Sequence, residues 1–110
     1  MESAFYRYYH VSKDCISQTW NTKEIESYLS SKGDFDNEGK GSYKHNTSFL
    51  SLQLMLVKDY NSWNSNDYNK TRTNYIVIIT SKKLNPTVET FIQDFETFLG
   101  WRIIEETDDD

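Results

Sequence analysis

The clearest hydrophobic pattern in the chain is alternation with the two-residue period of a β-strand. Residues 47–57 place four leucines on one face and a mixed set on the other, which predicts a strand with one buried face. Residues 3–11 alternate in the same way and are rich in aromatic side chains, which favours another strand. Residues 75–80 are a continuous apolar, β-branched run, which is typical of a central strand. Residues 101–107 alternate again and predict a last strand.

Apolar residues spaced three and four positions apart predict two helices. The first spans residues 22–32, with Asn21 or Thr22 as its N-cap and Gly33 as its stop. The second begins at Asn85-Pro86, because proline favours the first helical position, and it ends at Gly100. The apolar positions of the second helix form one broad face: Val88, Phe91, Ile92, Phe95, Phe98 and Leu99.

The predicted order is strand, helix, strand, strand, helix, strand. This is the order of the ferredoxin-like pattern, in which two helices cover one face of an antiparallel sheet. We therefore expect a single α+β domain over residues 1–107 and an acidic tail at 108–110. Residues 33–46 hold three of the four glycines and predict a loop. Residues 58–74 form a long, asparagine-rich polar connection.

Length and composition fit one small folded domain. The chain has 110 residues, and its 15% share of aromatic residues can supply a core rich in rings. No stretch approaches the roughly 18–20 apolar residues of a membrane span. The N-terminus also lacks the basic and apolar regions of a secretory signal. We therefore expect a cytoplasmic protein with no membrane partner.

No residue pattern carries a strong catalytic signature. Cys15 with His10 or His45 could form a thiolate–imidazole pair, but no glycine-framed turn surrounds the cysteine. The acidic positions in residues 34–38 match the start of a calcium loop, but His45 stands where the bidentate glutamate is needed. A single cysteine also excludes a disulfide within the chain and a multi-cysteine zinc site. We expect a non-enzymatic protein with no metal and no cofactor.

Negative charge is concentrated in the last fifth of the chain. The net charge is −5, but residues 89–110 carry eight acidic side chains against Arg102 alone, a net of −7, so that the other 88 residues sum to +2. This asymmetry opposes direct binding to nucleic acid and favours a basic protein partner. A solvated helix face with a solubilising tail would give the same pattern. If the charge serves binding, the electrostatic surface consists of Glu89, Glu96, Glu105 and Glu106.

The connection 58–74 combines large aromatic residues with many asparagines. Connections of about 15 residues without regular structure are uncommon unless they are functional or disordered. Tyrosine and tryptophan are enriched at interface hot spots, so this segment is either a partner-binding loop or a lid on the core. In the first case its anchors are Tyr60, Trp63, Asp67 and Tyr68.

These features together resemble the small acidic immunity proteins of bacterial toxin–immunity systems, including those of contact-dependent growth inhibition. The resemblance rests on chain length, acidity, asparagine content, the aromatic segment around Trp63 and the passage 95–106, Phe-Glu-Thr-Phe-Leu-Gly-Trp-Arg-Ile-Ile-Glu-Glu. It implies a non-enzymatic inhibitor that binds a cognate basic toxin domain, often a nuclease, and occludes its active site.

Two other classes of function remain open from the sequence. One is a ferredoxin-like small-ligand or regulatory module that dimerises through its sheet. The other is a reader of single-stranded RNA, with bases stacked on Tyr6, Tyr8 and Tyr75, although the negative charge opposes it.

Overall fold

The computed structural model describes residues 5–60, 67–83 and 85–106. In chain order the elements are β1 (Tyr6–Ser12), β2 (Trp20–Asn21), α1 (Thr22–Ser31), β3 (Phe35–Gly39), β4 (Ser42–His45), β5 (Leu50–Met55), β6 (Arg72–Thr73), β7 (Tyr75–Ser81), α2 (Pro86–Leu99) and β8 (Ile104–Glu106). None of the described helices is long and apolar enough to cross a bilayer. The acidic tail expected at 108–110 lies outside the described residues.

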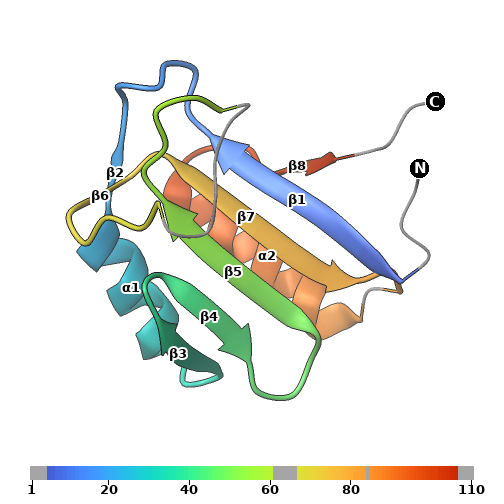
Figure 1. The fold of residues 1–110 in the computed structure, drawn as a ribbon. Helices are drawn as coiled ribbons and strands as arrows, with labels where there is room; N and C mark the ends of the chain where they lie inside the picture. Colours follow the sequence, from blue (N-terminus) through green and yellow to red (C-terminus); the bar gives the residue numbers. More distant parts are fainter. Residues whose placement is uncertain (1–4, 61–66, 84, 107–110) are drawn as a thin grey trace.

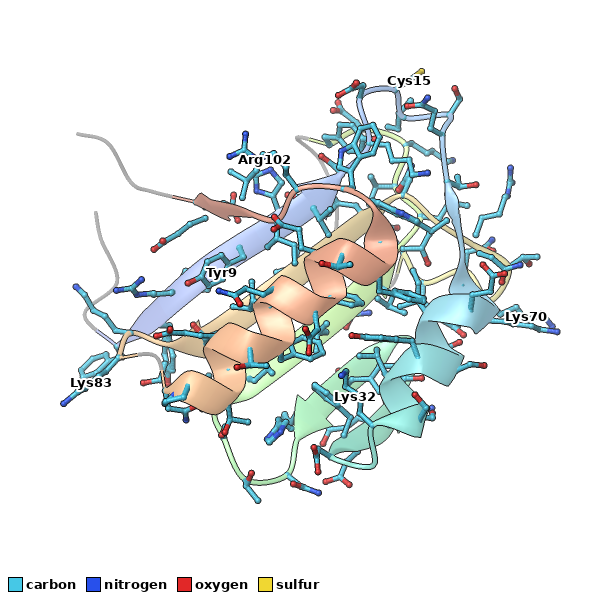
Figure 2. The ribbon with its side chains drawn as sticks, turned by 180° about the vertical axis from the view of Figure 1, so that it is seen from behind. Tyr9, Cys15, Lys32, Lys70, Lys83 and Arg102 are labelled. Carbon is cyan, nitrogen blue, oxygen red and sulfur yellow. The ribbon has the colours of Figure 1, made fainter. Side chains whose placement is uncertain are left out.

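Six strands form one antiparallel sheet in the order β3-β4-β5-β7-β1-β8. Without β2, β3, β4 and β6, which were not predicted, the chain order is the predicted strand, helix, strand, strand, helix, strand. Strand β7 lies inside the sheet, as its continuous apolar run predicts. Both helices lie against the same face of this sheet (Figures 1 and 2). The α+β prediction is therefore confirmed.

The helix ends follow from capping residues in the sequence. The Asn21 side chain accepts a hydrogen bond from the Glu24 amide, and the Asn85 side chain accepts one from the Val88 amide. Pro86 occupies the first turn of α2, where its missing amide hydrogen has no cost. Gly100 ends α2 in the left-handed conformation, with φ of 68°. The predicted starts and stops of both helices are thus confirmed to within a residue or two.

The main core lies between the helices and the sheet. Alternate residues of β1, β5 and β7 point into it, and α1 and α2 add one apolar face each. Phe95 is fully buried at its centre and stacks on Phe91 and Tyr28, with ring centroids 5.2 Å and 5.8 Å away. Burial of these large rings compensates for the modest aliphatic content of the chain.

The segment 33–46, expected to be a loop, is instead a β-hairpin. Strands β3 and β4 pair across a turn at Gly39, Lys40 and Gly41, whose φ angles are 91°, 52° and 79°. Glycine supplies two of these three positive φ angles at little steric cost. Phe35 and Tyr43, at the two ends of the hairpin, pack into the main core, which adds enough burial to hold the strands. The loop prediction is wrong because it weighed the glycines above these two aromatic residues.

A second correction concerns the connection 58–74. Its residues 72–73 form β6, which pairs with β2 in a separate two-stranded sheet. The buried Thr22 and Thr73 hydroxyls lie 2.7 Å apart and join this small sheet to the start of α1. The last part of the connection is therefore ordered by pairing with residues 51 and 53 positions earlier in the chain, a contact that local patterning cannot predict.

Candidate functional site

Tyr60 does not project from the molecule as a free anchor. Its hydroxyl donates to the Lys13 carbonyl at 2.9 Å, and its ring stacks on Tyr75 with centroids 5.7 Å apart. It belongs to a second apolar cluster on the helix-free face, formed by Met55, Val57, Tyr75 and Val77 with Ile16 and Ile79. At this position the structure favours the lid alternative over the interface alternative. Trp63 lies outside the described residues.

Asn74 fixes the backbone around this second cluster. It is 1% exposed, and its side-chain oxygen accepts from the Val57 amide at 2.8 Å. Its side-chain nitrogen donates to the carbonyls of Ile16 and Val57 at 3.0 Å and 2.9 Å. One buried amide therefore joins the loop after β1 to the segment after β5, and it holds Ile16 beside the cluster.

Tyr68 and Asp67 are likewise held against the body of the domain. The Tyr68 hydroxyl donates to one Glu26 carboxylate oxygen at 3.0 Å, and the Tyr43 hydroxyl donates to the other at 2.7 Å. Burial is the main cause that raises the pKa of both tyrosines, and the hydrogen bond to Glu26 raises it further. The Asp67 carbonyl accepts from the Leu56 amide at 2.7 Å. Tyr68 and Asp67 thus help to fasten this segment to α1 and the sheet.

The close packing of Tyr68 also explains a glycine. A Cβ atom on Gly41 would lie 2.6 Å from the Tyr68 ring and 2.9 Å from the Leu54 carbonyl. Gly41 therefore serves two purposes, because it adopts a positive φ in the hairpin turn and leaves room for the ring.

Three of the four predicted acidic residues lie on one flank of the domain, formed by α2 and β8. Glu105 lies 3.7 Å from the Arg7 guanidinium. A hydrogen bond with Tyr9 and the charges of Glu105 and Glu89 raise the pKa of Arg7. Glu96 accepts a hydrogen bond from the Ile103 amide at 2.8 Å, so it also orients the chain that leads into β8. We call Glu89, Glu96 and Glu105 the acidic flank.

Glu106 points to the other face of the sheet. It is paired in register with Tyr8, and its carboxylate lies 3.8 Å from Nδ1 of His10. Among the described residues, Tyr68 is thus separated from the acidic flank: it lies against Glu26 and Gly41, towards the β3-β4 side of the sheet, whereas the acidic flank lies at the β8 edge.

The helix-free face also carries exposed apolar side chains beyond the second cluster, and the sequence predicted two of them, Tyr6 and Tyr8, as stacking candidates but not Phe49 or Ile104. Tyr6 stacks on Phe49 with centroids 5.0 Å apart, and the exposed fractions of Tyr8, Phe49 and Ile104 are 38%, 53% and 52%. We call Tyr6, Tyr8, Phe49, Ile79 and Ile104 the open aromatic face. The alternation of Tyr6 and Tyr8 with buried Tyr9 and Val11 was its signal in the sequence.

The candidate catalytic residues have local structural partners. Nδ1 of His45 accepts from the amides of Thr47 and Ser48 at 3.2 Å and 3.0 Å. Cys15 lies at the tip of the loop between β1 and β2 (Figure 2), and its Sγ is 3.1 Å from the Ser17 hydroxyl. That hydrogen bond lowers the pKa of Cys15. Within the described ranges, no three side chains of His, Cys, Asp or Glu cluster as a metal site requires.

Comparisons of the chain with family models, with curated proteins and with solved structures each find no match. The fold and the surfaces define the class at this level: a small α+β domain with an acidic flank and, separately, an open aromatic face.

Proposed function

We propose that the protein is a non-enzymatic inhibitor that binds a basic protein, as the resemblance to immunity proteins implies. The partner would be a cognate toxin domain of nuclease type, met in the cytoplasm, whose cationic cleft the inhibitor covers. The observation that carries this proposal is the acidic flank, where Glu89 and Glu96 of α2, a helix without basic residues, lie beside the acidic strand β8.

The geometry of the flank suits electrostatic steering. Glu89 and Glu96 are seven residues apart on α2, so they lie on the same side of the helix, and Glu105 follows on the adjacent strand. Among these residues Glu105 and Glu89 share Arg7 as a counter-charge, and the flank keeps a net negative charge. Aligned charges of one sign accelerate encounter with a partner of the opposite sign.

The test begins with the tagged protein purified from its host, and a stoichiometric basic partner identified by mass spectrometry. Association rates with that partner are then measured over a salt series for the wild type and for Glu89→Lys. We expect the variant to associate at least tenfold more slowly at low salt, with a flatter salt dependence, and to protect cells less well from the partner.

Glu24→Lys is the matched control. Glu24 is exposed in the first turn of α1 as Glu89 is in the first turn of α2, so both reversals carry the same cost against the helix dipole. Only the position of the charge differs. Equal slowing by both variants, or no basic partner at all, would reject the acidic flank as a binding surface.

The second candidate is the small-ligand or regulatory module, and the open aromatic face is the observation that favours it. A ligand that binds the folded state raises the melting temperature by mass action. A rise in melting temperature with a small molecule, lost in Phe49→Lys and kept in Glu89→Lys, would favour this candidate over the inhibitor.

A further inference from the structure

The register of the sheet places six side chains in one row across the helix-free face. From β3 to β8 the row reads Asp36, Lys44, Ser51, Ile79, Tyr8 and Glu106. Ile79 on β7 is the middle member of the five that follow Asp36. Because neighbouring strands are about 4.8 Å apart, Lys44 and Glu106 lie roughly equal distances to either side of β7.

The next row towards the end of the sheet has the same balance. Ser81 on β7 is flanked by Tyr6 on β1, its register partner, and by Phe49, whose carbonyl accepts from the Ser81 amide at 3.4 Å. The two rings meet over the small serine, with centroids 5.0 Å apart. Apart from Asp36 at the β3 edge, both rows are therefore centred on β7.

We propose that the open aromatic face binds a second copy of this chain, about a two-fold axis that runs along β7. Rotation about such an axis exchanges the two sides of each row. Glu106 of one copy then faces Lys44 of the other, and Tyr8 faces Ser51. The Tyr6 and Phe49 rings face Phe49 and Tyr6 of the other copy, and Ile79 faces its own counterpart.

Charge decides between this axis and its alternative. A two-fold axis across the strands would place Glu106 against Glu106 and Lys44 against Lys44, which is unfavourable for like charges at an interface. The axis along β7 instead pairs Lys44 with Glu106 on both sides, and Asp36 of each copy then lies beyond β8 of the other. Both side chains are exposed enough to reach the other copy, because the exposed fraction is 62% for Lys44 and 48% for Glu106. Within its own copy, Lys44 lies 3.6 Å from Glu38, and Glu106 lies 3.8 Å from His10.

The size of the surface sets the strength of the dimer. The apolar part contains five side chains, whereas a standard interface contains roughly 20–30 residues from each partner. The opposite end of the same face is thickened by Tyr60 and Ile16, so the two sheets must diverge there. We therefore expect a weak dimer that dissociates on dilution.

The experiment is sedimentation equilibrium of the purified full chain, from micromolar to millimolar concentration. We expect a reversible monomer–dimer equilibrium for the wild type, and at least a tenfold weaker dimer for Phe49→Lys. Phe98→Lys is the matched control, since Phe98 is also a large exposed ring, 40% exposed, but lies on α2. It should leave the dimerisation constant unchanged. Circular dichroism confirms that each variant is folded.

The proposed pair of Glu106 and Lys44 across the interface is tested by exchanging the two charges. Glu106→Lys and Lys44→Glu should each weaken the dimer, and the double variant should recover most of the wild-type affinity. A wild type that stays monomeric at millimolar concentration overturns the proposal, as does equal weakening by Phe98→Lys or a double variant weaker than both single ones.

The other occupant of such a face is single-stranded nucleic acid. Titration of the same proteins into a fluorescent oligouridine distinguishes it: binding that is lost in Phe49→Lys, with a monomeric wild type, would assign the face to nucleic acid and reject the dimer. None of this depends on the proposed inhibitor, whose acidic flank stays accessible in the dimer because Glu89 and Glu105 lie away from the open aromatic face.

Discussion

The two faces of the central sheet carry similar side chains, which are buried on one face and exposed on the other. On the helix side, Tyr9 and Val11 of β1 are 7% and 0% exposed, within a core that α1 and α2 complete. On the other side, Tyr6 and Tyr8 of the same strand are 39% and 38% exposed. One strand thus presents tyrosine to the core and to solvent, and residue type alone does not distinguish structural from functional rings.

The largest expected difference between the faces is in stability. Phe95→Ala should lower the free energy of unfolding by about 3–5 kcal/mol, because it removes a fully buried ring and leaves a cavity. Phe49→Ala, the same substitution on the open aromatic face, should cost less than about 1 kcal/mol. Urea denaturation of both variants measures the difference. Equal losses would mean that Phe49 belongs to the core and that the two faces do not differ as described.

The second apolar cluster, which Tyr60 and Ile16 cover, should show a loss of stability between those of Phe95→Ala and Phe49→Ala. Asn74→Ala removes three hydrogen bonds and leaves the Val57 amide, the Val57 carbonyl and the Ile16 carbonyl without their partner. We expect the free energy of unfolding to fall by about 3 kcal/mol, because buried polar groups without a partner destabilise the folded state. Denaturation gives the free energy, and Asn46→Ala, at an exposed position, is the control. A loss below about 1 kcal/mol would contradict the role assigned to Asn74.

The smallest of these effects on stability concerns the hydrogen bond from Tyr43 to Glu26 at the edge of the main core. Tyr43→Phe removes the hydroxyl that donates to Glu26 and should cost about 1–3 kcal/mol at neutral pH. Tyr8→Phe, which removes a hydroxyl from the open aromatic face, should change stability by less than about 0.5 kcal/mol. Denaturation at neutral pH compares the two variants.

Tyr43→Phe should also change how stability depends on pH. Burial and the Glu26 hydrogen bond raise the pKa of Tyr43 in the folded state above the value of about 10 in the unfolded chain. The stabilisation is therefore complete below about pH 10 and is lost as the pH rises, because the unfolded chain releases the proton first. Stability should fall more steeply above pH 10 in the wild type than in Tyr43→Phe. Parallel pH profiles would contradict this.

Most of the fold could be predicted from local pattern. The six segments that became β1, α1, β5, β7, α2 and β8 carry their own periodicity, and Asn21, Asn85 and Gly100 mark helix ends. The β3-β4 hairpin was missed because its sequence is polar and glycine-rich, and its two anchors, Phe35 and Tyr43, are eight residues apart. The Gly-Lys-Gly turn between them was the signal that could have identified it.

The site was less predictable, for a physical reason. Alternation indicates which residues share a face, but whether a face is covered depends on contacts between distant segments. Tyr60 is held by Lys13 and Tyr75, and Tyr68 by Glu26, so two predicted anchors are occupied within the domain. Phe49, in contrast, is exposed because neither helix reaches that side of the sheet.

The most direct measurement is a dilution series followed by amide NMR, which compares the two faces residue by residue. If the open aromatic face binds a second copy, the amides of Tyr8, Ser51 and Ile79 shift with concentration. Those of α1 and α2 that line the main core stay constant. Spectra that do not change with concentration, or shifts confined to the helices, would contradict the assignment of structure to one face and binding to the other.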